Sequence, residues 1–206
     1  RITPDVYLQT LSDAGIAASR IGTDAVRLER PLPVQQIPGF SDGQVSVQDA
    51  GAQLAAPLLD LQDGMRVLDA CAAPGGKTGH MLEYADLDLL ALDCDGGRLE
   101  RIGDNLRRLQ LDARLQTGDA SHHDWWDGTP FDRILADVPC TASGIVRRHP
   151  DIRWLRRKDD AARLATLSTQ ILDNLWQMLR PDGKLLFVTC SLWPRESEQQ
   201  AAAFAE

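Results

Sequence analysis

Short runs of aliphatic and branched residues alternate, from about residue 66 onward, with segments in which apolar residues recur every three or four positions. The short runs are typical of buried strands and the longer spacing of amphipathic helices. The pattern predicts five strands, at residues 66–69, 87–93, 113–116, 133–137 and 184–189. Because strands and helices alternate, we expect an α/β fold with a doubly wound, mostly parallel sheet and right-handed crossovers.

Two helices are predicted between these strands. In residues 98–109 the apolar positions that share one face are Leu99, Ile102, Leu106 and Leu109. In residues 159–180 they are Leu164, Leu167, Ile171, Leu175 and Met178. Pro181-Asp182-Gly183 is expected to end the second helix, since proline and glycine interrupt helical hydrogen bonding.

The first 45 residues have a different pattern. A helix is predicted at residues 4–14, a strand at 25–29 and a proline-rich loop at 31–39, and a further helix at 48–59 leads into the sheet. We therefore expect residues 1–45 to form a small α+β lobe on one edge of a larger domain that comprises residues 46–206.

Composition favours a globular chain. Of the 206 residues 43% are hydrophobic and 25% charged, and no run of 18 apolar residues exists, which argues against disorder and a membrane span. The four cysteines form no CxxC pair, so we expect reduced thiols, a cytoplasmic location and no metal site. The chain begins with Arg1 rather than Met and stops within a helical pattern, so we expect a piece of a longer protein.

Charge is unevenly distributed. The net charge of −8 argues against binding nucleic acid through the overall field. Residues 1–95, however, carry 14 acidic and 6 basic side chains, whereas residues 147–158 carry six basic side chains and one acidic side chain. A local basic segment thus remains available for an anionic partner.

Residues that can bind a ligand or take part in catalysis follow each of the predicted strands. The segments concerned are 69–78, 93–95, 118–120, 137–140 and 189–191. In an open parallel sheet, ligands bind beyond the carboxyl ends of the strands. All four cysteines fall in these segments, so we expect them at one edge of the sheet: Cys71, Cys94, Cys140 and Cys190.

The first of these segments suits a nucleoside. Its glycines allow close approach of backbone to a ligand, but it is neither a G-x-G-x-x-G nor a Walker loop, because Cys71 stands five residues before Gly76. Asp93 and Asp119 would repel a pyrophosphate yet accept hydrogen bonds from ribose or adenine. Taken singly, each aspartate is equally consistent with a helix cap or a turn.

Three motifs together resemble a known family. Asp69-Ala-Cys-Ala-Ala-Pro-Gly-Gly-Lys-Thr78, Asp137-Val-Pro-Cys140 and Thr189-Cys-Ser191 look like the signature set of the RNA cytosine-5 methyltransferases that use S-adenosylmethionine. The segment 141–155 resembles the bacterial Sun/Fmu (RsmB) branch, which methylates a cytosine of small-subunit ribosomal RNA. The resemblance implies a Rossmann-like class I methyltransferase fold, ribosomal RNA as partner and an RNA-binding region that includes residues 1–45. It also implies closing C-terminal strands beyond this chain.

The resemblance also implies roles for two cysteines. Cytosine carbon 5 accepts a methyl group after a thiolate has added at carbon 6, and its proton must then be removed. Cys190 is implied as the nucleophile and Cys140 as the residue that aids proton removal or product release. The reverse order remains open, because related DNA enzymes use the cysteine of a Pro-Cys pair. Asp137 is expected between cofactor and base.

Two further sets of site residues are expected. The cofactor S-adenosylmethionine, and its product S-adenosylhomocysteine, would contact Cys71, Ala72, Ala73, Pro74, Gly75, Gly76, Lys77, Asp93, Asp119 and Asp137. The RNA would contact Arg147, Arg148, His149, Arg153, Trp154, Arg156 and Arg157. Basic side chains with an interleaved aromatic ring suit phosphates and a splayed base, although a solvated helix face gives the same pattern.

Two other functions fit parts of the sequence. Gly75-Gly76-Lys77-Thr78 also suggests a P-loop-like nucleotidase, and a methyltransferase fold can serve as a non-catalytic RNA-binding module. The presence of both Cys140 and Cys190 argues against the binding module, which needs neither thiol. No membrane and no obligatory protein partner is expected.

Overall fold

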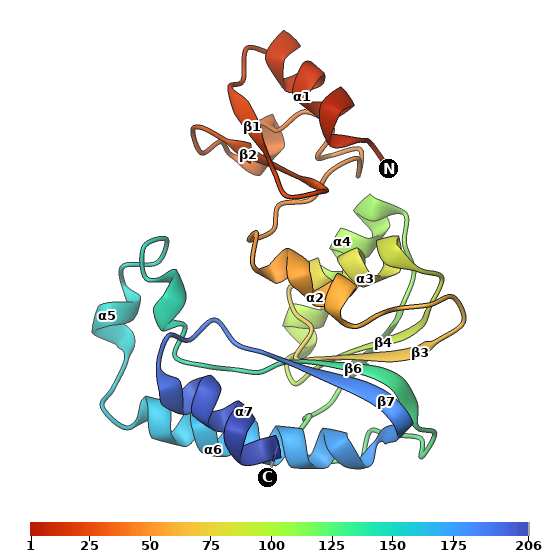
Figure 1. The fold of residues 1–206 in the computed structure, drawn as a ribbon, viewed down its shortest axis with the longest axis vertical. Coiled ribbons are helices and arrows are strands. Elements are labelled where there is room, and N and C mark those ends of the chain that lie inside the picture. Colours follow the sequence, from red (N-terminus) through yellow and green to blue (C-terminus); the bar gives the residue numbers. More distant parts are fainter. Residues whose placement is uncertain (206) are drawn as a thin grey trace.

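The computed structural model describes residues 1–205, and a five-stranded sheet forms its centre (Figure 1). The strands are β3 (Arg66–Ala70), β4 (Asp88–Asp93), β5 (Arg114–Thr117), β6 (Phe131–Asp137) and β7 (Leu179–Val188). Their spatial order is β5-β4-β3-β6-β7, and each neighbouring pair is parallel. The chain winds outward from β3 to β5 and then returns to β6 on the other side of β3. The predicted doubly wound parallel sheet is therefore confirmed.

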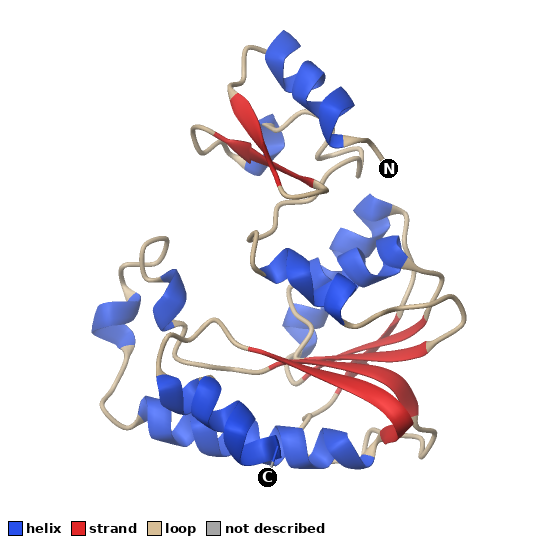
Figure 2. Cartoon of the chain, in the orientation of Figure 1, coloured by secondary structure: helices blue, strands red, loops and turns tan. Residues whose placement is uncertain are grey.

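Helices cover both faces of the sheet (Figure 2). One face packs against α2 (Ala55–Leu58), α3 (Gly76–Tyr84) and α4 (Gly96–Leu109), and the other against α6 (Asp160–Gln177), with α7 (Glu198–Ala205) beside α6. Strand β3 serves both layers, because Val67 lies in one apolar cluster and Leu68 in the other. Both side chains are fully buried, as expected for a central parallel strand.

Helix α4 confirms the predicted amphipathic pattern. All four inward residues, Leu99, Ile102, Leu106 and Leu109, are buried. Burying each such side chain contributes about 1.5–3 kcal/mol. The helix begins where Asp95 Oδ1 accepts hydrogen bonds from Gly97 N (2.8 Å) and Arg98 N (3.2 Å). It ends at Leu109, and the next residue, Gln110, caps it with a φ of 53°.

The predicted end of the second helix at residue 180 is wrong. Helix α6 ends at Gln177, because Leu179 already pairs with Phe131 of β6. Pro181-Asp182-Gly183 lies inside β7, where the pairing with β6 changes register between Phe131 and Arg133. Sheet pairing thus overrides the local helix signal. Within residues 1–205, no helix combines the length and the apolar content needed to cross a membrane.

The helix expected at residues 48–59 is much shorter than predicted. A 3-10 turn at η2 (Ala52–Leu54) leads into the single turn of α2. Asp49 Oδ1 accepts a hydrogen bond from Gly51 N (2.9 Å), a local contact that competes with helix formation. Pro57 also lacks the N–H that an earlier start would require.

The N-terminal residues form a helix and a hairpin that lie apart from the sheet (Figure 1). Their elements are α1 (Pro4–Asp13), β1 (Ala18–Ile21), β2 (Ala25–Leu28) and η1 (Val34–Gln36). Helix α1 and strand β2 were expected, whereas β1 was not. Arg108 of α4 attaches the following segment by donating to Phe40 O (2.7 Å) and Val45 O (3.0 Å). The division of the chain at residue 45 stays a prediction.

Candidate active site

The loop after β3 is the predicted cofactor loop, residues 71–77. Gly75 has a φ of +91°, and a Cβ at this position would lie 2.9 Å from Ile102 Cγ2 and 3.1 Å from Ile102 Cα. Glycine therefore lets the loop pack directly on α4. Ala72 N donates to Leu92 O (2.9 Å) and ties the start of the loop to β4. The backbone of the loop is thus held against two neighbouring elements.

Asp93, at the end of β4, holds this loop through hydrogen bonds to its backbone. It is 2% exposed, and its carboxylate accepts hydrogen bonds from Ala73 N and Asp95 N, both at 3.1 Å. Arg98 lies 3.4 Å from the same carboxylate and donates to Ala73 O (2.9 Å). Asp93 therefore holds the loop in the structure, and its contact with a ribose stays a prediction.

Lys77 and Asp137 join the cofactor loop to the end of β6. Lys77 Nζ lies 2.6 Å from Asp137 Oδ2, and both side chains are partly buried. The sequence predicted both residues in the site but did not indicate that they pair. The ion pair places Asp137 between the loop and the neighbouring Cys140 segment.

Asp69 is buried beneath the same loop. Its Oδ2 accepts a hydrogen bond from Thr78 Oγ1 (2.6 Å), whereas its Oδ1 is buried without a partner among residues 1–205. Burial raises the pKa of Asp69 to about 7, against the opposing effect of the Thr78 hydrogen bond. Asp69 is therefore a carboxyl group that titrates near neutral pH.

Asp119 follows β5 and is half exposed. Its Oδ1 accepts from Ser121 N (2.8 Å) and Ser121 Oγ (2.7 Å), and the Ser121 hydroxyl contact is the main reason that its pKa is lowered. A Cβ on Gly118 would lie 2.9 Å from side-chain atoms of Leu92 and Trp125, so glycine lets the backbone pack closely against both. Asp119 is thus an ionised, accessible carboxylate at the expected edge.

The two cysteines assigned to chemistry are adjacent. Cys140, beyond β6, and Cys190, beyond β7, place their Sγ atoms 3.3 Å apart. The pKa of Cys140 is lowered to about 6, chiefly because its sulfur accepts a hydrogen bond from the Cys190 thiol. The same contact, followed by burial, raises the pKa of Cys190. The two sulfurs therefore share one proton near neutral pH.

Cys71 and Cys94 lie at the same edge without such a partner in the described chain. Burial, with smaller effects from nearby carboxylates, raises the pKa of Cys71 to about 12, whereas Cys94 is exposed. Cys71 has a positive φ of 61° and contributes its backbone to the loop. Its thiol is consequently a neutral, partly buried group.

A hydrogen-bond network behind the cysteine pair was not predicted. It connects Thr141, Ser143, Ser191 and Glu196, of which Glu196 belongs to η4 (Pro194–Glu196) and is 3% exposed. A glutamate in a short polar segment carries no sequence signal for burial, since its partner Thr141 is 55 residues away.

The basic segment, residues 147–158, follows η3 (Ser143–Ile145) and contains α5 (Ile152–Leu155), and all seven expected RNA-contacting residues are exposed. Trp154 is 87% exposed. Arg156 Nε donates to Thr141 O (2.8 Å), which places it against the Cys140 loop. Arg148 instead forms an ion pair with Asp49. The segment therefore contacts two separate parts of the molecule.

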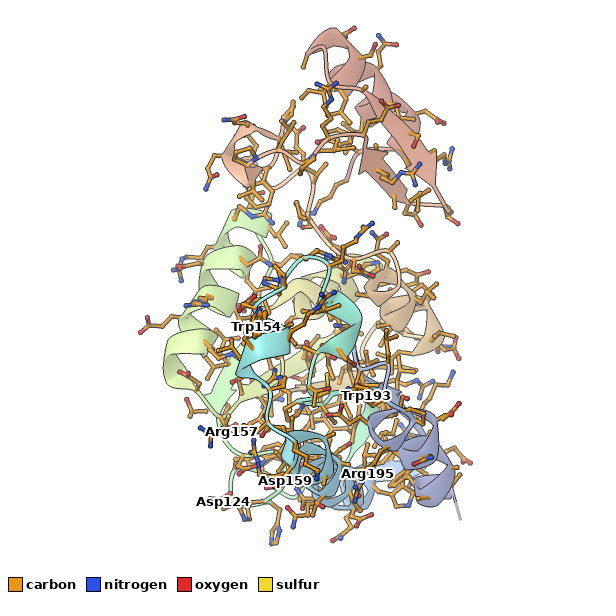
Figure 3. The ribbon with its side chains drawn as sticks, turned by 90° about the vertical axis from the view of Figure 1, so that its left-hand side faces the viewer. Asp124, Trp154, Arg157, Asp159, Trp193 and Arg195 are labelled. Atoms are coloured by element: carbon orange, nitrogen blue, oxygen red, sulfur yellow. The ribbon has the colours of Figure 1, made fainter. Side chains whose placement is uncertain are left out.

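Figure 3 shows one face on which Trp154 and Arg157 lie with Trp193 and Arg195. The latter two come from the segment after Cys190 and were not expected in the site. Trp193 is 57% exposed and the adjacent Leu192 is 76% exposed. Exposed apolar side chains are typical of binding surfaces, and the periodicity of the sequence does not show that these two lie beside the cysteine pair.

A separate groove lies between the basic segment and the N-terminal elements. Its volume is about 660 Å³, and Arg147 and Arg148 line it together with Tyr7, Val26 and Leu32. None of the cysteines and none of the expected cofactor residues lines it. The structure thus brings Arg147 and Arg148 to this groove and Arg156 to the cysteine pair.

A family model matches most of the chain. Its description is 16S rRNA methyltransferase RsmB/F, and the match covers residues 56–206. The ribosomal RNA small subunit methyltransferase B of Vibrio cholerae is 52% identical over 204 residues, which are 97% of this chain and 47% of that protein. The chain spans about half the length of the curated relatives it matches.

Solved structures give the same fold. A methyltransferase homolog protein from Pyrococcus horikoshii superposes with a TM-score of 0.83 at 30% identity, over 98% of this chain and 65% of that one. NSun6 from Pyrococcus horikoshii with SFG superposes with a TM-score of 0.77 at 27% identity, over 88% of this chain and 48% of that one. The expected Rossmann-like class I methyltransferase fold is confirmed.

Proposed function

The chain belongs to the RsmB/F family of 16S rRNA methyltransferases, and from this premise we propose that the full-length protein methylates carbon 5 of a cytosine in small-subunit ribosomal RNA. The observation that carries the proposal is the 3.3 Å separation of Cys140 Sγ and Cys190 Sγ at the ends of neighbouring strands. Methyl transfer to an atom that is already nucleophilic would need neither thiol.

The chemistry of cytosine explains why two thiols are useful. Carbon 5 is a weak nucleophile until a thiolate adds to carbon 6 and shifts the electron pair of the 5,6 double bond toward carbon 5. After carbon 5 has gained the methyl group, its proton must leave so that the double bond re-forms and the carbon–sulfur bond breaks. One group is needed for each task.

We assign Cys190 as the nucleophile and Cys140 as its proton acceptor. The lowered pKa of Cys140 keeps its sulfur ionised near neutral pH, so it can take the proton of the Cys190 thiol as Cys190 Sγ bonds to carbon 6. Once that proton has passed to solvent, the Cys140 thiolate is again able to take the carbon 5 proton. The reverse assignment, with Cys140 as nucleophile, predicts instead that RNA becomes linked to Cys140 in Cys190→Ala.

The residues at this edge fit S-adenosylmethionine. Bound there, the cofactor supplies an electrophilic methyl group. The neighbouring carboxylates Asp93, Asp119 and Asp137 can accept hydrogen bonds from ribose hydroxyls and from amino groups, whereas they would repel a phosphate. The backbone of residues 71–77 supplies the remaining contacts, and Lys77 orients Asp137 through their 2.6 Å ion pair.

We assign the exposed basic segment to RNA. Arg156 lies against the Cys140 loop, so a phosphate that it holds is close to the thiols. Trp154 presents a free ring on which an unstacked base can lie. A cytosine must leave any helix to meet a thiol and a methyl donor, which favours a single-stranded or splayed target.

Methyl transfer to unmodified 16S rRNA tests the proposal. Full-length protein is incubated with tritiated S-adenosylmethionine and in vitro transcribed 16S rRNA, and the labelled nucleoside is identified after digestion. We expect 5-methylcytidine with the unaltered protein and none with Cys190→Ala. Label at another atom of the RNA, or no label with any small-subunit RNA or particle, contradicts the proposal.

A further inference from the structure

Glu196 is a buried carboxylate that the proposed reaction does not use. It ends the short turn η4, six residues after Cys190, and is 3% exposed. Within residues 1–205 it takes part in no ion pair, so its charge is balanced by hydrogen bonds alone. Burying a charged group in this way is costly unless every oxygen is satisfied.

Its three donors all belong to residues that directly follow the paired cysteines. Thr141, next to Cys140, donates its backbone N–H to Glu196 Oε1 (2.8 Å) and its hydroxyl to Oε2 (2.5 Å). Ser191, next to Cys190, donates its hydroxyl to Oε2 (2.6 Å). One carboxylate therefore bridges the two loops that carry the thiols.

The sheet brings these two loops to one edge, but its pairing ends before the cysteines. The last paired residues of β6 and β7 are Asp137 and Val188, and one further bond joins Val138 N to Val188 O (3.1 Å). Both cysteines lie beyond this point. Their loops are instead joined by the Glu196 bridge and by a bond from Gly144 N to Cys190 O (2.9 Å).

The bridge is part of a larger polar network. Ser191 Oγ lies 3.2 Å from Ser143 Oγ, which accepts a hydrogen bond from Leu192 N (2.8 Å). Networks of this kind define a single geometry when all their members are satisfied. Loss of the carboxylate would leave Thr141 N and two hydroxyl groups without their common acceptor.

We propose that Glu196 is a positioning residue, which fastens the Cys140 loop to the Cys190 loop and thereby holds the two sulfur atoms at their 3.3 Å contact. The inference rests on the proposed function, because carbon 5 methylation is the reaction that needs both thiols together. Glu196 contacts the residues behind the cysteines and acts on the reaction through them.

Three variants of the full-length protein test this assignment. Glu196→Ala removes the bridge, and Glu196→Gln keeps its shape, with an amide oxygen for Thr141 N and an amide NH₂ for a hydroxyl group. Glu198→Ala, at an exposed glutamate two residues further on, is the matched control.

The first measurement is the pH dependence of Cys140 alkylation. The second is the rate at which diamide, a dithiol oxidant, links Cys140 to Cys190. Both are read by peptide mass spectrometry, beside kcat and KM for methyl transfer.

For Glu196→Ala we expect the alkylation inflection to move upward from near pH 6 and disulfide formation to slow about tenfold. We expect kcat to fall by up to about 100-fold, the effect of a misplaced reacting group, while KM for the cofactor changes less than about twofold. Glu196→Gln should recover most of each loss, and Glu198→Ala should match the unaltered protein.

An unchanged inflection and disulfide rate in Glu196→Ala overturn the proposal, even if methyl transfer is reduced. Should that variant fail to fold, the double variant Thr141→Val with Ser191→Ala removes both hydroxyl donors to Glu196. Its alkylation inflection and its disulfide rate then decide whether Glu196 holds the cysteine pair. If the unaltered protein transfers no methyl group, the proposed function fails, while the thiol measurements still decide the role of Glu196.

Discussion

Cys140 Sγ lies 3.3 Å from Cys190 Sγ, although 50 residues separate the two cysteines along the chain. The contact arises because β6 and β7 are parallel neighbours, so the segments that follow them meet at one edge of the sheet. At this distance one sulfur donates a hydrogen bond to the other, and the pair behaves as a single titrating unit.

Cys140 should react as a thiolate well below the pH at which an ordinary cysteine does. Its pKa of about 6 depends first on the hydrogen bond from Cys190. Alkylation by iodoacetamide, followed by peptide mass spectrometry, should therefore increase with pH through about 6 and level off above 7. In Cys190→Ala the inflection should move toward about 8.5, the value of a free thiol. An inflection at the same pH in both proteins would show that Cys190 does not stabilise the thiolate.

Gly144→Ala should disturb the cysteine pair without unfolding the protein. The added Cβ would lie 2.5 Å from Cys190 O, too close for either backbone to stay in place. We expect kcat to fall about 10- to 100-fold, since reacting groups tolerate little displacement. Gly103→Ala, in helix α4, is the control, because its Cβ would meet side chains at 3.4 Å. Full activity of Gly144→Ala would mean that the Cys190 backbone can shift freely.

Cys71 should resist modification in the folded protein. Burial raises its pKa to about 12, so at pH 8 only about one molecule in 10⁴ carries the reactive thiolate at this position. Exposed Cys94 should be alkylated at least about 100-fold faster under the same conditions. Denaturation with urea should remove the difference. Equal rates at Cys71 and Cys94 in the native protein would contradict a neutral, partly buried Cys71.

Asp69 should make the protein less stable as the pH increases from 4 to 7. Its pKa is about 7 in the folded protein and near 3.8 in the unfolded chain, so the folded form binds the additional proton in this range. Between pH 5 and 7 this costs about 2 kcal/mol of unfolding free energy. Asp69→Asn, which keeps an oxygen for Thr78, should flatten the decrease in urea unfolding experiments without cofactor. A variant with the slope of the unaltered protein would exclude Asp69 as its source.

The sheet and the edge that carries the site could be predicted from sequence, because both depend on local patterns. Aliphatic runs identify β3 to β7, and the residues that follow each run must lie at one edge of a parallel sheet. This reasoning placed Asp137, Cys140 and Cys190 together. It failed at residues 178–183, where pairing with Phe131 decides the conformation.

The details that depend on distant partners could not be predicted. Glu196 is polar and lies two residues after Pro194, which suggests an exposed turn, and its burial depends on hydrogen bonds from Thr141 and Ser191. The contact of Arg148 with RNA stays a prediction, and its ion pair with Asp49, 99 residues earlier in the chain, had no sequence signal. In both cases the decisive contact joins segments whose proximity follows from the fold and not from spacing.

Covalent trapping of RNA tests the central claim most directly. Full-length Cys140→Ala and Cys190→Ala are each incubated with S-adenosylmethionine and 16S rRNA, and the products are separated on a denaturing gel. With Cys190 as nucleophile, Cys140→Ala should accumulate a protein–RNA adduct linked through Cys190. Without Cys140 the Cys190 thiol loses the contact that raises its pKa and can give its proton to solvent as it adds to carbon 6, whereas the carbon 5 proton is no longer removed efficiently. Cys190→Ala should form no adduct. An adduct on Cys140 in Cys190→Ala, with none in Cys140→Ala, would contradict this account.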